Sequence, residues 1–164
     1  MFVTWWAPGL DSRPVDATAR PQAPFDRFGG HAFFDQLVAT FYAGVAGDAA
    51  LRSLYPEEDL GPAAERLQLF LEQYWGGPTT YSQERGHPRL RMRHNPYVID
   101  DDARDRWLKH MRAALDLAME EHGLDPSWEE ELWRYLVGAA VAMVNHVPAA
   151  QPGIRVQDDI QETR

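Results

Sequence analysis

At residues 70–96 the chain reads FLEQYWGGPTTYSQERGHPRLRMRHNP, and this stretch decides how the rest folds. Gly76-Gly77-Pro78 predicts the end of a helix, because glycine favours the left-handed conformation and proline cannot continue a helix. From Thr79 to about Gly86 the sequence predicts irregular structure. Between Pro88 and Pro96 one short helical piece fits, since a proline disfavours helix at the residue before it. A compact domain seldom keeps so long a non-helical segment without a functional reason.

Apolar side chains recur every three or four residues before this stretch, which is the period of an α-helix. The pattern predicts a long helix from near Gly30 to before Gly47 and a second long helix that opens at Gly61-Pro62. A short helix between them begins after Asp48, a suitable N-cap, and ends before Pro56. The apolar positions of the two long helices are Phe34, Leu37, Val38, Phe41, Tyr42, Val45, Leu67, Phe70, Leu71 and Tyr74.

The same period continues after the stretch. A third long helix begins in the acidic run Asp100–Asp102, which suits a helix N-terminus, and Gly123 ends it. A fourth begins at Asp125-Pro126 and runs to Val147. Strand-like alternation is absent. The sequence therefore predicts an all-α fold of helices packed in pairs, with a loop-like segment between the second and third.

Charge and composition exclude several classes of function. The chain has 164 residues and a formal net charge of −9, whereas nucleic-acid binding needs clustered cations. It contains no cysteine, so disulfides, zinc–thiolate sites, iron–sulfur clusters and cysteine nucleophiles are excluded. No apolar run is long enough to span a membrane, and the N-terminus does not have the pattern of a secretory signal. We expect a cytoplasmic location.

The two ends of the chain differ in composition from its centre. Residues 1–24 are rich in proline and show no helical period, which predicts a flexible extension, with Trp5 and Trp6 as surface contacts or assembly residues. Residues 148–164 are polar and predict a mobile tail. The folded domain is expected to span residues 25–147.

His94 is the strongest candidate for chemistry. It ends the short helical piece before Pro96, so its imidazole can be aimed rigidly at a cavity, and neutral imidazole suits iron. Arg89, Arg91 and Arg93 beside it, in an acidic protein, suggest an anionic cofactor. The alternatives are that His94 is a hydrogen-bonded core or surface histidine and that Arg89 and Arg91 form a solvated face.

Tyr42, Tyr55 and Trp107 are candidates for a polar cluster, because Tyr42 and Trp107 fall on apolar helix faces and a buried O–H or N–H needs a partner. Each could donate to a nearby backbone carbonyl. If all three instead converge on one pocket, they would stabilise a polar ligand such as O₂ bound to iron. Leu67, Phe70 and Leu71 would supply apolar walls.

The chain resembles the group II truncated haemoglobins, a type common in actinobacteria, over roughly residues 28–146. The matching stretches are FYA at residues 41–43, LYPE at 54–57, FLEQYWGGP at 70–78 and GHPRLRMRH at 86–94. The resemblance implies a two-over-two helical sandwich that binds haem b. Tyr55, where most globins have phenylalanine, is typical of one branch of the group.

The family also implies roles for individual residues. His94 would be the proximal iron ligand, and Tyr42, Tyr55 and Trp107 the distal hydrogen-bonding set. Ala63 would stand where other globins often have a distal histidine. The remaining predicted haem contacts are Leu67, Phe70 and Leu90, with Arg93 and Tyr81 as partners of the haem propionates.

Three hypotheses for function follow. The first is a haem protein that binds O₂ reversibly, and also CO and NO, with slow release caused by the distal donors. The second is an enzyme that oxidises nitric oxide with bound O₂, or turns over peroxide, using an external reductase. The third is a haem-free helical interaction module. The chain is expected to be a monomer or a homodimer, without nucleic-acid or membrane partners.

Overall fold

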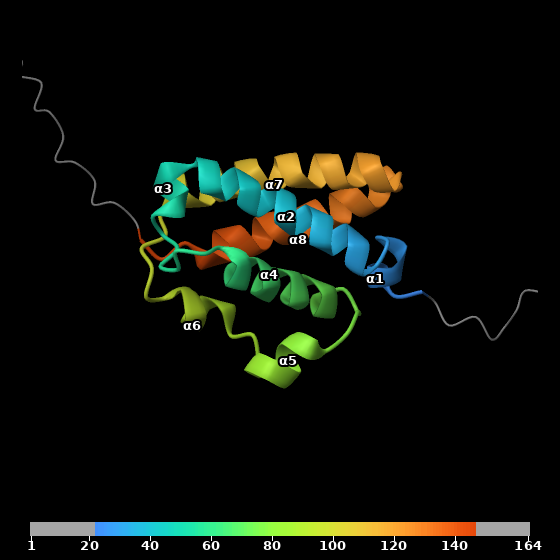
Figure 1. The fold of residues 1–164 in the computed structure, drawn as a ribbon, viewed down its shortest axis with the longest axis horizontal. Coiled ribbons are helices and arrows are strands. Elements are labelled where there is room, and N and C mark those ends of the chain that lie inside the picture. Colours follow the sequence, from blue (N-terminus) through green and yellow to red (C-terminus); the bar gives the residue numbers. More distant parts are fainter. Residues whose placement is uncertain (1–21, 147–164) are drawn as a thin grey trace, which may run out of the picture.

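The computed structural model describes residues 22–146, and this part of the chain is entirely helical apart from its connections (Figure 1). Five of its eight helices were predicted within a few residues of their observed bounds: α2, α3, α4, α6 and α7. The elements are α1 (Pro24–Arg27), α2 (His31–Gly47), α3 (Ala49–Arg52), α4 (Gly61–Tyr74), α5 (Thr80–Arg85), α6 (Leu90–His94), α7 (Asp101–His122) and α8 (Pro126–Met143).

Side-chain caps explain where several helices begin. Asp48 accepts a hydrogen bond from the backbone N–H of Leu51 at 3.2 Å and opens α3. Asp100 accepts from Ala103 N at 2.9 Å and opens α7. Each cap pairs a backbone donor that the first helical turn leaves without a partner. Gly123 ends α7 with a φ of 58°, a conformation that glycine adopts without strain.

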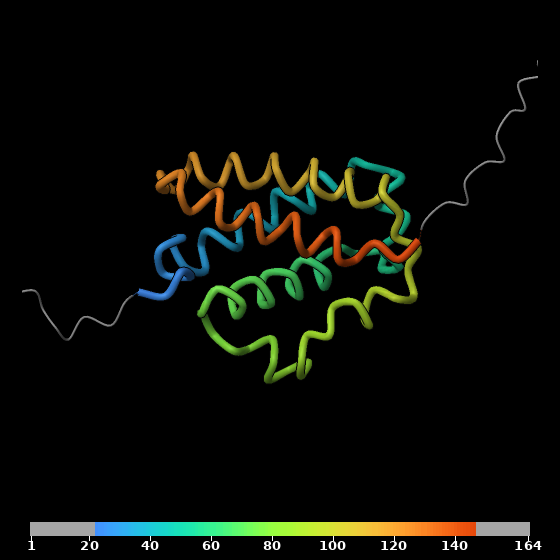
Figure 2. The backbone as a smooth tube through the Cα atoms, turned by 180° about the vertical axis from the view of Figure 1, so that it is seen from behind, coloured from blue at the N-terminus to red at the C-terminus, as the bar shows by residue number. Residues whose placement is uncertain are grey.

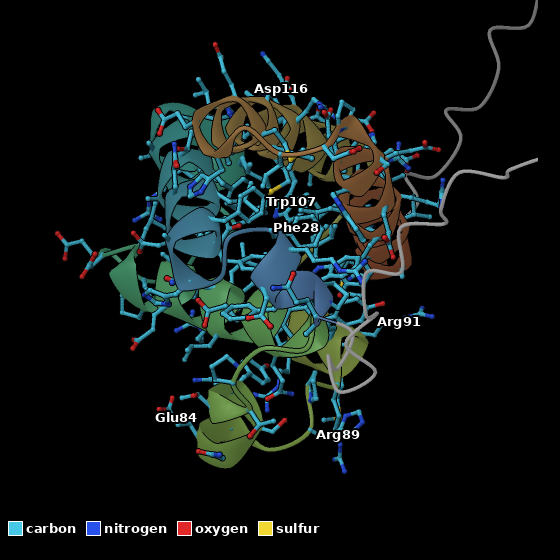
Figure 3. The ribbon with its side chains drawn as sticks, turned by 90° about the vertical axis from the view of Figure 1, so that its right-hand side faces the viewer. Phe28, Glu84, Arg89, Arg91, Trp107 and Asp116 are labelled. Carbon is cyan, nitrogen blue, oxygen red and sulfur yellow. The ribbon has the colours of Figure 1, made fainter. Side chains whose placement is uncertain are left out.

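The long helices form two packed pairs, the two-over-two arrangement that the sequence predicted. Helix α2 packs against both α4 and α7, and α7 packs against α8. Seen from behind, α7 and α8 run antiparallel, joined by a tight connection (Figure 2). In the view along the bundle, Trp107 and Phe28 project into the space that the four long helices enclose (Figure 3). None of the helices in residues 22–146 is long and apolar enough to cross a membrane.

An aromatic cluster joins the beginning of the described chain to the bundle. Phe28 is fully buried, with its ring 5.4 Å from that of Phe33 and 5.4 Å from that of Trp75. The backbone N–H of Phe25 donates to Trp75 O at 2.8 Å. Helix α1, which the periodicity did not predict, is therefore fastened to the end of α4.

The segment from Thr79 to Gly86 differs from its prediction, because Thr80–Arg85 forms helix α5 rather than irregular structure. Long-range contacts explain the difference. The Gln73 side chain donates to Ser82 Oγ at 2.6 Å and accepts from Ser82 N at 2.9 Å, while Tyr81 is buried. A six-residue helix held by another helix leaves no clear period in the sequence.

Helix α8 ends at Met143, earlier than predicted. The backbone N–H groups of Asn145 and His146 both donate to Ile99 O, at 3.0 and 3.1 Å. The Asn145 side chain also accepts from Ile99 N at 3.0 Å. These bonds hold the chain beside the connection between α6 and α7. Val147, the predicted extension with Trp5 and Trp6, and the tail 148–164 lie outside the described residues, apart from 22–24.

Candidate functional site

A cavity of about 440 Å³ lies between the helices, and all ten site residues that the family resemblance implies line it. All helices from α2 to α8 contribute to its wall. The predicted residues that line it are Tyr42, Tyr55, Ala63, Leu67, Phe70, Tyr81, Leu90, Arg93, His94 and Trp107. Of the six histidines, all within residues 22–146, His94 alone lines this cavity.

The orientation of His94 follows from one hydrogen bond. Its Nδ1 lies 2.7 Å from Leu90 O. A carbonyl oxygen only accepts, so Nδ1 carries the proton and Nε2 keeps its lone pair. Metal-binding histidines are commonly held in this way, with the second ring nitrogen bonded to a carbonyl. The bond therefore fixes which tautomer the neutral imidazole adopts and leaves Nε2 as the nitrogen that can bind a metal.

The loop before α6 is held by Arg93. Its Nε donates to Pro88 O at 2.8 Å and its Nη2 donates to Arg85 O at 2.8 Å. Arg89, at the start of α6, has a φ of 43°, in the left-handed region that side chains rarely adopt. The two bonds from Arg93 brace the loop that leads into this conformation.

The other two arginines of this segment do not line the cavity. Arg89 and Arg91 are exposed, and their side chains point away from the body of the protein (Figure 3). The predicted alternative of a solvated face therefore describes both residues, and of the three arginines only Arg93 lies at the cavity.

The three predicted polar donors meet in the wall of the same cavity. The rings of Tyr42 and Tyr55 lie 5.7 Å apart at an interplanar angle of 77°. Burial raises the pKa of Tyr55, whereas hydrogen bonds with Tyr42 and Trp107 lower it. Burial also raises the pKa of Tyr42, and its hydrogen bond with Tyr55 adds to the rise.

The indole N–H of Trp107 can only donate, so it donates to the Tyr55 oxygen. The hydroxyls of Tyr42 and Tyr55 share a second hydrogen bond, which uses one of their two protons. The other hydroxyl proton remains free to donate to a ligand. Both hydroxyls stay neutral at physiological pH because burial opposes their ionisation.

Arg52 holds the loop that carries Tyr55. Its guanidinium donates to Tyr55 O at 3.0 Å, to Glu57 O at 2.7 Å and to Glu58 O at 2.8 Å. A planar guanidinium can serve several acceptors in a fixed geometry. This contact could not be predicted from the sequence, because the three carbonyls belong to a loop without a helical period.

Sequence reasoning also missed charged residues at the cavity: Arg66, Arg85, Arg104 and Glu57. Arg66 forms an ion pair with Glu57 at 2.6 Å, and its hydrogen bond lowers the pKa of Glu57. One signal was present in the sequence. Arg66 falls between Ala63 and Phe70 on the apolar face of α4, and a charged side chain on such a face indicates an ion-pair partner or a functional role.

Comparison with known proteins identifies the class of fold. The family model described as bacterial-like globin matches residues 23–145. A group 2 truncated hemoglobin of Bacillus subtilis is 39% identical over 127 residues, which cover 77% of this chain and 92% of that protein. Fold and site therefore define a globin.

Solved structures agree with this assignment. A thermostable hemoglobin from the actinobacterium Thermobifida fusca has 58% sequence identity and a TM-score of 0.73, covering 78% of this chain and all of that one. A truncated oxygen-avid haemoglobin from Bacillus subtilis has 40% identity and a TM-score of 0.69, covering 76% of this chain and 100% of that one. This chain belongs to the group II truncated haemoglobins. It is accordingly a haem protein, which removes the hypothesis of a haem-free module.

The residues present fit a haem. The free Nε2 of His94 is a suitable ligand for iron. Much of the lining is apolar, as a porphyrin requires, with Leu67, Phe70 and Leu90 among its residues. Arginine side chains at the same cavity supply the positive charge that carboxylates need.

Proposed function

We propose that this protein binds haem b through His94 and binds O₂ reversibly on the opposite face, where Tyr42, Tyr55 and Trp107 slow its release. The observation that supports this proposal is the convergence of one oriented imidazole and three polar side chains on a single cavity. Neither group would need this placement for a purely structural role.

The proximal residues would hold the cofactor. When bound, the haem would supply an iron that can bind a diatomic gas. His94 Nε2 is directed by the bond between Nδ1 and Leu90 O. Tyr81 and Arg93 are the proposed propionate partners, and Arg66 and Arg85 are two further cations at the cavity. Two of the Arg93 donors already bond to carbonyls, so its propionate contact would use the remaining ones.

The distal residues would stabilise the ligand. Tyr55 is hydrogen-bonded to Tyr42 and to Trp107, which holds its oxygen in place, and in this proposal its own proton is directed at the bound gas. One such bond to a ligand with partial negative charge contributes ~1.5–3 kcal/mol, or about 10- to 100-fold in dissociation. Ala63 keeps this part of the wall small and apolar.

The first experiment is absorption spectroscopy of protein supplied with hemin. We expect a Soret band that His94→Ala largely removes, because no other histidine lines the cavity. His87→Ala is the matched control, since His87 is exposed in the same segment. A full Soret band in the His94 variant, with unchanged affinity for hemin, would contradict the ligand assignment.

The second experiment is stopped-flow measurement of O₂ dissociation. Tyr55→Phe removes the proposed donor and the acceptor for both neighbours, so we expect release to be about 10- to 100-fold faster. Tyr42→Phe and Trp107→Phe remove one bond to Tyr55 each and should have smaller effects. The Tyr97→Phe variant, at the same cavity, serves as the control. Unchanged dissociation in all three distal variants would refute the distal role.

A further inference from the structure

Two stacked tyrosines connect the cavity with the surface of the protein. Tyr135 on α8 lines the cavity, and Tyr74 at the end of α4 is 53% exposed. Their ring centroids lie 3.9 Å apart at an interplanar angle of 27°. Trp75 lies edge-on to both rings, at 5.3 Å from Tyr74 and 5.7 Å from Tyr135. The cavity therefore reaches solvent through side chains that can be oxidised.

Such a stack can carry single electrons. Phenols lose one electron readily, and overlapping π-systems at van der Waals contact couple strongly. An oxidised tyrosine must also release its proton. Tyr74 can release it to water, whereas burial and the neighbouring Tyr74 raise the pKa of Tyr135 and so oppose loss of its proton. The stable tyrosyl radical is therefore expected on Tyr74 rather than on Tyr135.

We propose that Tyr74 is a surface site at which small phenols are oxidised by one electron when hydrogen peroxide is reduced in the cavity, with Tyr135 as the relay. This inference rests on the proposed binding of haem. Tyr74 lies where a donor too large to enter the cavity can still reach an oxidised side chain.

The reaction balances with hydrogen peroxide as the oxidant. Its O–O bond breaks, and with two electrons and two protons it becomes two molecules of water. Tyr74 supplies one electron and one proton in each of two cycles and becomes a phenoxyl radical each time. A small phenol then transfers one hydrogen atom to the Tyr74 oxygen, which restores the tyrosine. The sum is one peroxide and two phenols giving two waters and two phenoxyl radicals.

The test uses the haem-loaded full-length protein, with hydrogen peroxide and without added phenol. Tyr74 radicals then couple between molecules through a C–C bond between ring carbons. We expect a tyrosyl signal in electron paramagnetic resonance and a dityrosine-linked dimer, whose peptides contain residue 74 by mass spectrometry. Tyr74→Phe keeps the stack but should lose both signals, and Tyr135→Phe should weaken them. Tyr97→Phe, a change at the same cavity, should leave them intact.

Guaiacol serves as the phenol in the second arm. It should suppress the dimer in the natural protein, and its oxidation should be slower in Tyr74→Phe. A cross-link through another tyrosine, or an unchanged yield in Tyr74→Phe, overturns the proposal. The Soret band distinguishes failure of the relay from failure of the proposed function. A chain that takes up no haem refutes both the haem-binding function and the relay. Haem-loaded protein without oxidation at Tyr74 refutes the relay alone.

Discussion

Whether alanine at position 44 on α2 stabilises or destabilises the protein depends on the side chain of His110 on α7. A Cβ atom at position 44 would lie 2.5 Å from His110 Nδ1 and 3.0 Å from His110 Cγ. The ring cannot easily turn away, because its Nε2 bonds to Asp48 Oδ2 at 3.1 Å. Gly44→Ala must therefore displace the imidazole and separate it from Asp48.

Two effects oppose each other in Gly44→Ala. Alanine stabilises a helix by about 1 kcal/mol relative to glycine. Overpacking of a tight contact costs about 1–3 kcal/mol. Gly44→Ala also breaks the hydrogen bond between His110 and Asp48. Together, the three effects should lower the free energy of unfolding by about 1–2 kcal/mol. In His110→Ala the obstructing ring is gone, so the same substitution should stabilise the protein by up to about 1 kcal/mol.

Urea denaturation of the four haem-loaded proteins, as a double-mutant cycle, measures both values. The coupling between positions 44 and 110 should be about 2–3 kcal/mol, the difference between the two expected effects. If Gly44→Ala is equally destabilising with and without the His110 ring, steric conflict with that ring is not the cause and the reasoning fails.

Three further predictions concern the pocket and its supports. Hydrogen bonds from His110 and from Leu51 N lower the pKa of Asp48 from its ordinary 3.8 to about 2, so the stability they confer is present above pH ~4 and lost as the pH falls towards 2. Acid unfolding followed by circular dichroism should therefore be less steep over this interval for Asp48→Asn; identical slopes would contradict it. Arg52→Gln removes the guanidinium that holds the Tyr55 loop and should speed O₂ release less than Tyr55→Phe does, while Arg134→Gln, in an exposed ion pair, should have no effect in the same stopped-flow assay. Gly77→Ala places a Cβ 2.7 Å from Phe25 Cδ2 and 2.8 Å from Glu72 O and should cost about 1–3 kcal/mol in urea denaturation, whereas Gly47→Ala, with open space around it, should not destabilise.

Much of the fold could be predicted because its long helices carry their own signals. Asp48 and Asp100 were recognisable as caps, and both accept the expected backbone hydrogen bonds. Helices α1 and α5 could not be predicted in this way. Their four and six residues are too few to show a period, and each depends on a distant partner, Trp75 O for α1 and Gln73 for α5.

In the candidate site, too, some features could be predicted from the sequence and others depend on contacts between distant residues. The resemblance supplied all ten residues, and the structure brings all ten to one cavity. The sequence did not indicate that Tyr42 and Trp107 both hydrogen-bond to Tyr55. That arrangement follows from the packing of Tyr55 between side chains of two different helices, α2 and α7. Nor did the sequence indicate that Arg93 braces its own loop.

The sequence alone determined the helix boundaries set by caps, glycines and prolines, and the family whose residues it carries, because these depend on neighbours a few positions apart. The tertiary structure alone decided the tautomer of His94, the hydrogen bonds of Tyr55 with Tyr42 and Trp107, and the stacking of Tyr74 on Tyr135. Each of these depends on the distance between atoms that packing, rather than local sequence, brings together.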